Sequence, residues 1–353
     1  MKKKLVIIIA VVILVYVGVF LVKKHKTAQN VLPSEQIFDQ HETLTDLTKL
    51  EMVSAGSYTG SVSSGGHTRS YTIHIPKEYT TTQKYALVFL FHGGSGNGKI
   101  PTTLIGGASF LKDSGMEVKA DSSGFIVVAP DALEGNWNDG RGTTNTEKEG
   151  IDDVQFVRDM LTALEKKYAI DPKKIYAAGI SNGGMFSHRL ACEAPDIIAA
   201  IGPVSSAIPK PIMSTCTSKV AMVGIQGTED PFVSFDGSVS EKMKRISGNG
   251  GAVAGAIETM NLWATNNQCS LTPTITALPV IVSDGTSVQK YSFSGCSTSG
   301  AVSYYVINGM GHAWPGGMMS AKKQMVQVIS GPTSGNLNTP DVLWEFFSAH
   351  PHL

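Results

Sequence analysis

A series of short, largely apolar segments recurs along the chain, and this series most constrains the fold. The segments span residues 85–91, 125–129, 175–178, 198–204, 220–225 and 302–307. Strands that are uniformly apolar are buried on both faces, as in parallel sheets covered by helices. An earlier stretch alternates instead, with Tyr71, Ile73 and Ile75 between polar residues before Pro76, and therefore predicts a half-exposed strand.

Segments with helical periodicity lie between these strands. One of them has apolar residues at steps of three and four, namely Val154, Val157, Leu161, Leu164 and Tyr168. Asp152 and Asp153 begin it, where negative charge complements the helix dipole. The last helix is predicted with Thr339 as its N-cap and Pro340 in its first position. Alternating strands and helices predict one doubly wound, mostly parallel α/β sheet flanked by helices.

The charge balance argues against one class of partner. Apart from six lysines among the first 26 residues, the chain has 23 basic and 29 acidic side chains, a net charge of −6. A protein that grips a phosphate backbone usually has a basic excess on its binding domain, so no nucleic-acid partner is expected. A composition of 42% hydrophobic and 16% charged residues also excludes a disordered or coiled-coil protein.

The N-terminus predicts a membrane segment. Leu5 to Val22 is a run of 18 residues without a charge, bracketed by lysines, and as a helix it can just cross a hydrocarbon core of about 30 Å. We predict a transmembrane signal-anchor over residues 1–26, a spacer over 27–56 and a single domain over 57–353. A cleaved signal peptide ending near Ala28 is the alternative. Three lysines on each flank leave the orientation open by the positive-inside rule. Together with the cysteines, the segment predicts a domain outside the cytoplasmic membrane, anchored or secreted.

Four cysteines bear on the compartment: Cys192, Cys216, Cys269 and Cys296. None forms a C-x-x-C pair, so no zinc site is expected. Four cysteines allow three disulfide pairings, and four buried thiols in a cytosolic protein are the alternative. The export-type N-terminus and the even number favour an oxidising compartment.

The strongest local motif is Gly179-Ile180-Ser181-Asn182-Gly183. It directly follows the segment 175–178 and directly precedes a helix-like run through Leu190. A serine at such a strand-to-helix corner projects its hydroxyl above the sheet, and flanking glycines are needed because side chains there would collide with the neighbouring backbone. Ser181 is therefore the candidate nucleophile.

A serine nucleophile needs a base and an acid that orients the base. Asp230 follows the strand 220–225, and His312 follows the strand 302–307, in the chain order expected for this type of site. We assign His312 as general base and Asp230 as its acid. Glu229 is the nearest rival acid, and Asp341 is better explained as a first-turn helix charge. His188, on the helix after Ser181, is expected to be a surface or packing residue.

A glycine-rich loop, His92-Gly93-Gly94-Ser95-Gly96, follows the strand 85–91. Acyl transfer places negative charge on the former carbonyl oxygen, which backbone N–H groups stabilise. We predict one donor near Gly94 or Ser95 and the other at Asn182, with His92 shaping the loop. The loop does not end in G-K-[ST], so the sequence does not support a phosphate-binding site here.

Two tryptophans have open roles. Trp137 follows the strand that ends near residue 129, and Trp314 lies two residues after His312. Each is a candidate for the wall of a substrate pocket, and loop packing over the core is an equally weighted alternative. The predicted chemistry needs no metal and no organic cofactor.

These motifs resemble a known family, the polyhydroxybutyrate depolymerase-type esterases, which include feruloyl and acetylxylan esterase relatives. The resemblance spans about residues 57–350 and rests on H-G-G-S-G-N-G from 92, Y-A-A-G-I-S-N-G-G-M from 176, L-A-C-E-A-P-D from 190, G-T-E-D-P-F-V from 227 and G-M-G-H-A-W-P-G-G from 309. It implies an exported α/β-hydrolase with Ser181, Asp230 and His312 as its triad. It also implies a disulfide between Cys269 and Cys296 and makes one between Cys192 and Cys216 plausible. Gln226 departs from the family, where histidine is frequent.

The resulting hypothesis is an exported serine carboxylester hydrolase that works through an acyl-enzyme. Its partners would be a small or oligomeric ester and, through the N-terminal helix, a membrane. A serine peptidase on the same fold is one alternative, although such enzymes usually carry a propeller or a substantial cap domain. A non-catalytic binding protein is another, but it would have no reason to keep nucleophile, acid and base together.

Overall fold

The structure, a computed structural model, describes residues 53–95, 106–238, 241, 251–297, 300–317 and 330–352. The predicted membrane segment at residues 5–22 and most of the predicted spacer lie outside these residues. Within the described ranges, no helix combines the length and the apolar character that a membrane crossing requires.

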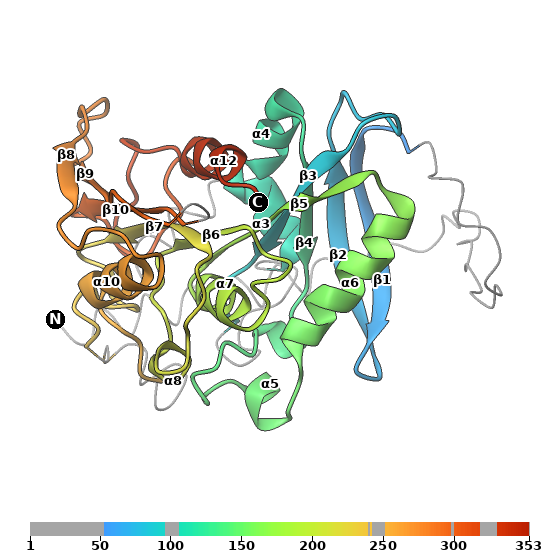
Figure 1. Cartoon of the computed structure of the whole chain (residues 1–353), viewed down its shortest axis with the longest axis horizontal. Helices are drawn as coiled ribbons and strands as arrows, with labels where there is room; N and C mark the ends of the chain where they lie inside the picture. The colour runs from blue at the N-terminus through green and yellow to red at the C-terminus, as the bar shows by residue number, and fades with distance from the viewer. Residues whose placement is uncertain are drawn as a thin grey trace, which may run out of the picture. The chain divides into compact units, whose positions relative to one another are not determined.

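The described residues contain a ten-stranded sheet in the order β1-β2-β4-β3-β5-β6-β7-β10-β9-β8 (Figure 1). Its strands are β1 (Gly56–Ser64), β2 (His67–Ile75), β3 (Tyr85–Phe91), β4 (Ile126–Pro130), β5 (Ile170–Ile180), β6 (Ala200–Val204), β7 (Ala221–Gly227), β8 (Thr274–Ala277), β9 (Ser287–Ser292) and β10 (Val302–Asn308). The six central strands, from β4 to β10, pair in parallel, and the outer pairs on each side are antiparallel. The prediction of a mostly parallel sheet is confirmed.

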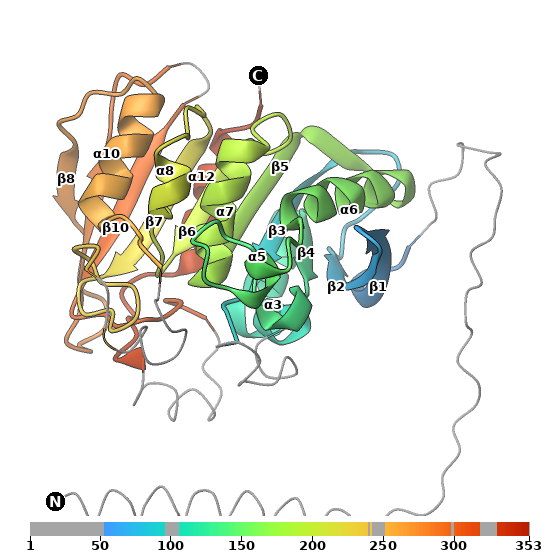
Figure 2. The ribbon, with the colours of Figure 1, turned by 90° about the horizontal axis from the view of Figure 1, so that it is seen from below.

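Helices cover both faces of the sheet. They are α3 (Gly107–Ser114), α4 (Met116–Ser123), α5 (Asn145–Lys148), α6 (Asp153–Lys167), α7 (Asn182–Glu193), α8 (Lys210–Met213), α10 (Ala256–Asn266) and α12 (Thr339–Ala349), with a 3-10 turn η1 (Leu133–Gly135). The buried side chains of α6, α7 and α10 pack on one face, where Figure 2 shows these helices side by side, and those of α3, α4 and α12 pack on the other.

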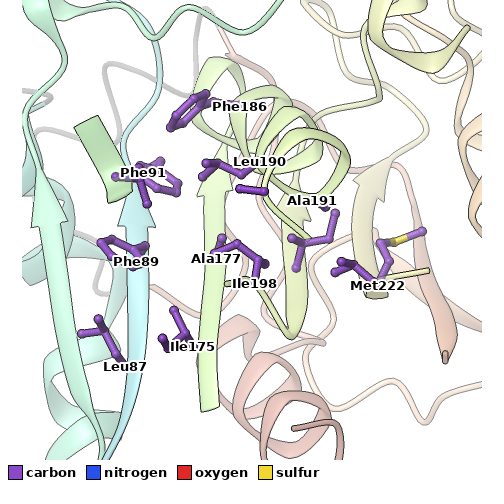
Figure 3. Packing of buried hydrophobic residues seen from close by; sticks show 14 of the residues in the cluster. Leu87, Phe89, Phe91, Ile175, Ala177, Phe186, Leu190, Ala191, Ile198 and Met222 are labelled. Carbon is purple, nitrogen blue, oxygen red and sulfur yellow. The ribbon is translucent and has the colours of Figure 1, made fainter. Parts of the chain in front are cut away.

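Strand β3 explains why both faces are apolar. Alternate residues of a strand point to opposite sides, so Phe89 joins the core under α7 while its neighbour Val88 joins the core under α12. Both side chains are fully buried. Figure 3 shows Phe89 and Phe91 of β3 facing the same layer as Ala177 of β5 and Phe186 of α7. The apolar runs in the sequence are thus the two-sided core of the sheet.

Several boundaries differ from the sequence prediction. The side chain of Asn338, not of Thr339, caps α12 by accepting the N–H of Asp341, which shifts the cap by one residue. Strands β1, β8 and β9 were not predicted. Every residue of β8 is exposed, so its short Thr-Ile-Thr-Ala alternation marks no buried face.

The predicted helix start at Asp152 and Asp153 is confirmed, but the two carboxylates act differently. The side chain of Asp152 accepts the N–H of Gln155 as an N-cap. Asp153 is fully buried and lies 2.7 Å from the Arg69 guanidinium, which also stacks 3.7 Å from the ring centroid of Phe156. Asp153 therefore ties α6 to β2, a role that local sequence does not reveal.

The disulfide that the resemblance implied and the one that it made plausible are both present. Cys192 of α7 is bonded to Cys216, and Cys269 is bonded to Cys296. The alternative of four free thiols is therefore wrong for this structure.

Candidate active site

The site lies where the order of the parallel strands reverses. The chain passes from β3 to β4 on one side and then to β5 on the other side of β3. In open α/β sheets, ligands bind at such a switch point, outside the carboxyl ends of the strands. Gly93 follows β3, Ser181 follows β5, and a Cβ added at Gly93 would lie 3.5 Å from the Cβ of Ser181. The two motifs are therefore side by side.

Ser181 has an unusual backbone conformation, with φ of 56° and ψ of −123°. Positive φ is strained for any residue except glycine, and such strain gathers at functional sites. The tight corner that this conformation makes requires its flanking glycines. A Cβ on Gly183 would lie 2.3 Å from the carbonyl oxygen of Phe91, and one on Gly179 would lie 2.7 Å from it. Both distances are too short for a side chain, so any residue larger than glycine would collide with this backbone, as predicted.

His312 and Asp230 are joined as predicted. His312 Nδ1 lies 2.8 Å from Asp230 Oδ2, and the other oxygen, Oδ1, accepts the N–H groups of Phe232 and Val233. The Asp230 side chain is fully buried, whereas 14% of the His312 side chain is exposed. Glu229 is exposed, so Asp230 and not Glu229 contacts the imidazole.

The loops that carry Ser181 and His312 meet at the end of β6. The N–H of Ser181 donates to the carbonyl of Val204 at 3.0 Å. The next residue, Ser205, bonds through its Oγ to both the N–H and the carbonyl of Ala313, which follows His312. Among the described residues, no hydrogen bond joins the Ser181 hydroxyl to the imidazole. Such bonds are often long without substrate and tighten when it binds.

The predicted oxyanion donors are only partly available. A Cβ on Gly94 would lie 3.3 Å from the Cβ of Asn182, so these two residues are adjacent. Ser95 is different, because its N–H donates to the carbonyl of Gly135 at 2.9 Å and its hydroxyl donates to the carbonyl of Glu134. The assignment of Ser95 as a donor is therefore corrected, and the remaining candidates are Gly94 and Asn182, the first residue of α7.

The Asn182 side chain is held by a loop that the sequence did not single out for this role. Its Oδ1 accepts the N–H of Trp137 at 2.7 Å, and its Nδ2 donates to the carbonyl of Trp137 and to Asp139. Asp139 is fully buried and pairs with Arg141 at 2.8 Å. This network fixes the start of α7, which carries the Asn182 N–H.

His92 has a structural role, in line with the prediction that it shapes its loop. Its Nδ1 lies 2.7 Å from the carbonyl of Gly93, and its Nε2 lies 3.1 Å from the N–H of Ala132. A carbonyl accepts and an N–H donates, so the ring carries its proton on Nδ1 and is neutral. Burial lowers the pKa of His92, although the bond to Gly93 acts in the opposite direction.

Both candidate pocket tryptophans are packed in the core. Trp137 is fully buried, stacks on Phe186 and donates its indole N–H to the carbonyl of His92. Trp314 is 8% exposed, meets Phe110 edge to face and donates to the carbonyl of Ser114. The packing interpretation therefore replaces the pocket interpretation for Trp137, and it is favoured for Trp314.

Gln226 supports the loop that carries the acid. It is fully buried. Its Oε1 accepts the hydroxyl of Tyr304, and its Nε2 donates to the carbonyl of Val233 at 2.9 Å. The N–H of Val233 in turn donates to Asp230. The departure at Gln226 therefore acts on the backbone around Asp230.

The other titratable candidates lie elsewhere. His188 is fully buried in α7, where its Nδ1 accepts the indole N–H of Trp263, and burial lowers its pKa to about 3. Its predicted packing role is thus the observed one. Asp341 pairs with Lys119 at 2.9 Å and not with a histidine. Across the described ranges, no group of three or more His, Cys, Asp or Glu side chains is placed to hold a metal ion.

Comparisons with known proteins give consistent similarities. Residues 63–292 match the family described as "Putative esterase". The chain is 25% identical over 310 residues to the "Putative esterase NocK" of Nocardia uniformis subsp. tsuyamanensis, covering 86% of each chain. It is 28% identical over 284 residues to "Feruloyl esterase C" of Emericella nidulans, covering 80% of this chain and 84% of the relative. The solved structure of an acetyl xylan esterase from Aspergillus awamori shares the fold, with a TM-score of 0.52 at 16% identity, over 82% of this chain and 99% of that one.

Proposed function

The chain belongs to the putative esterase family, which makes it a carboxylic ester hydrolase, and from that premise we propose that it works as a serine esterase through an acyl-enzyme. Ser181 is the nucleophile, His312 the general base and Asp230 the acid that orients it. The observation that carries this proposal is the 2.8 Å contact between His312 Nδ1 and Asp230 Oδ2. The loop of His312 is also bonded to Ser205, the neighbour of Val204, which accepts the N–H of Ser181.

The proposed reaction has two halves. The imidazole Nε2 takes the proton of the Ser181 hydroxyl as its oxygen attacks the ester carbonyl, and the imidazolium then protonates the leaving alcohol. Water, deprotonated by the same nitrogen, then attacks the acyl-enzyme, and the imidazolium returns that proton to the Ser181 oxygen as the acid leaves. Asp230 stays ionised and accepts the hydrogen bond of the Nδ1–H group throughout, which leaves Nε2 free to accept from the hydroxyl and stabilises the imidazolium.

The negative oxygen of each tetrahedral intermediate is proposed to lie between the N–H groups of Gly94 and Asn182. In the described part of the chain, neither N–H donates to another protein atom. Asn182 also begins α7, and the positive end of a helix dipole favours negative charge there. Each such donor contributes roughly 3 kcal/mol to stabilising the transition state.

The relatives suggest the substrate. Feruloyl and acetyl xylan esterases are named for esters of a phenolic acid or of acetic acid, and we propose substrates of this kind. Hydrolysis of polyhydroxybutyrate, which the sequence motifs suggested, remains a prediction.

The two disulfides support a location outside the cytosol. Disulfides persist in oxidising compartments and are rare in cytosolic proteins, and this chain contains two. We propose an exported enzyme. The enzyme could be attached to the membrane through residues 5–22 or released after cleavage of a signal. Cell fractionation and the mass of the mature chain distinguish these two outcomes.

Two measurements test the proposed chemistry. The purified protein is treated with a fluorophosphonate probe, and its turnover is assayed on methyl ferulate, p-nitrophenyl acetate and a peptide anilide. We expect a label on Ser181 and turnover of esters only. Absence of the label together with absence of turnover would favour a binding protein, and anilide turnover without ester turnover would favour a peptidase.

A further inference from the structure

Ser205 lies at the junction of all three catalytic loops. It is the first residue after β6 and is fully buried. Its N–H donates to the carbonyl of Ile225 at 2.8 Å, on the strand that leads to Asp230. The preceding residue, Val204, accepts the N–H of Ser181. The backbone at positions 204 and 205 is therefore fixed to both the nucleophile's turn and the acid's strand.

The hydroxyl of Ser205 adds the third connection. Its Oγ donates to the carbonyl of Ala313 at 2.8 Å and accepts the N–H of Ala313 at 3.1 Å. A hydroxyl is a donor and an acceptor at once, so one atom satisfies both backbone groups of Ala313. On its other side, the N–H of His312 donates to the carbonyl of Ser330 at 2.6 Å. The backbone of His312 is thus held from both sides.

The backbone conformation of Ser205 is one that favours glycine, which indicates that the serine hydroxyl is needed there. Its φ is 45°, in the left-handed region, where glycine would be less strained. Glycine could keep the backbone bonds to Ile225, but it could not bond Ala313. A serine at a position where the backbone favours glycine therefore points to the side-chain contact as its function.

We infer that Ser205 is a positioning residue that sets the separation between the His312 imidazole and the Ser181 hydroxyl. This inference rests on the proposed function. A backbone hydrogen bond joins Ser181 to Val204, the residue before Ser205. The Ser205 hydroxyl then bonds Ala313, the residue after His312. The loops of the base and of the nucleophile are thereby hydrogen-bonded to two consecutive residues, Val204 and Ser205, at the end of one strand. Small errors in such a separation slow proton transfer without changing how substrate binds.

The test compares Ser205→Ala and Ser205→Gly with a matched control, Ser206→Ala. Ser206 is the next residue and is also buried, at 1% exposure, but its hydroxyl has no hydrogen-bond partner among the described residues. Each full-length variant is assayed for kcat and KM on p-nitrophenyl acetate, for its rate of fluorophosphonate labelling and for its melting temperature.

Both Ser205 variants should lose kcat by roughly 10- to 100-fold with KM within about twofold, because the geometry of the base is disturbed and binding is not. The labelling rate should fall in parallel, and Ser206→Ala should stay near wild type. Ser205→Gly relieves the positive φ and so keeps the test valid if the alanine variant folds poorly. A kcat of Ser205→Gly near wild type, or an equal loss in Ser206→Ala, would overturn the inference.

Ser181→Ala separates this inference from the proposed function. If Ser181→Ala still hydrolyses esters, the proposed mechanism is wrong. If Ser181→Ala is inactive while both Ser205 variants match wild type, only the positioning role is wrong.

Discussion

Asp230 divides its two oxygens between the imidazole of His312 and the N–H of Val233. Oδ2 lies 2.8 Å from His312 Nδ1, and Oδ1 accepts the Val233 N–H at 2.9 Å. The carboxylate therefore has one orientation, in which Oδ2 accepts a hydrogen bond from the imidazole ring.

Asp230→Asn should lower kcat by about 10³- to 10⁴-fold, because an amide can present a donor to Nδ1 and favour the wrong tautomer of the base. KM should change much less. Glu229→Gln is the matched control, since Glu229 is the adjacent acid but is exposed. Steady-state kinetics on p-nitrophenyl acetate measures both variants. A large loss in Glu229→Gln with a small loss in Asp230→Asn would reverse the assignment of the acid.

Ser181→Gly should abolish turnover and raise the free energy of unfolding by about 1 kcal/mol, because glycine accepts a positive φ without the strain that serine bears. The φ of 56° at Ser181 is the basis of this prediction. Ser181→Ala should be equally inactive without that gain in stability. Urea unfolding of the three proteins makes the comparison. Equal stability of the glycine and alanine variants would show that the conformation of Ser181 costs nothing.

His188 should make the protein sensitive to acid. Burial lowers its pKa to about 3, below the ordinary value near 6.5, so the unfolded chain binds a proton that the folded chain does not. Stability is therefore complete above about pH 6.5 and falls as the pH drops toward 3. From pH 7 to pH 4 this one group should remove about 3 kcal/mol. His188→Asn, which keeps an acceptor for Trp263, should be less stable at pH 7 but should lose less stability in acid. Parallel pH profiles of the two proteins would contradict this role.

Removing the disulfide between Cys192 and Cys216 should lower the free energy of unfolding by about 3 kcal/mol, since the two cysteines are 24 residues apart and close a loop of that size. The double variant Cys192→Ala/Cys216→Ala tests this by urea unfolding under non-reducing conditions. Dithiothreitol should destabilise wild type more than it destabilises the variant. If dithiothreitol affects both proteins equally, this disulfide makes no contribution.

Sequence patterns predicted the parts of the protein that depend on near neighbours in the chain. The apolar run 85–91 is β3 in full, and the run 302–307 is β10 without its last residue. The glycines around Ser181 are needed for the reason predicted, a collision with backbone. The edge strand β8 was missed because it has only four residues and all of them are exposed, so its polar–apolar alternation marks no buried face.

Other features required contacts between distant segments. Ser95 was a candidate oxyanion donor by sequence, but its N–H bonds Gly135, forty residues away. Trp137 was a candidate pocket wall, but it is buried against Phe186. Ser205 belongs to no catalytic motif in the sequence, and only the bond to Ala313 reveals it.

The sequence by itself determined the fold class, the strand-to-helix corner at Ser181 and the chain order of Ser181, Asp230 and His312, because periodicity and turn geometry act over a few residues. The tertiary structure decided which acid faces the imidazole, which N–H groups are already occupied and which residue holds His312 in place. Those choices depend on the order of strands in the sheet, which brings residues many positions apart within 3 Å of each other.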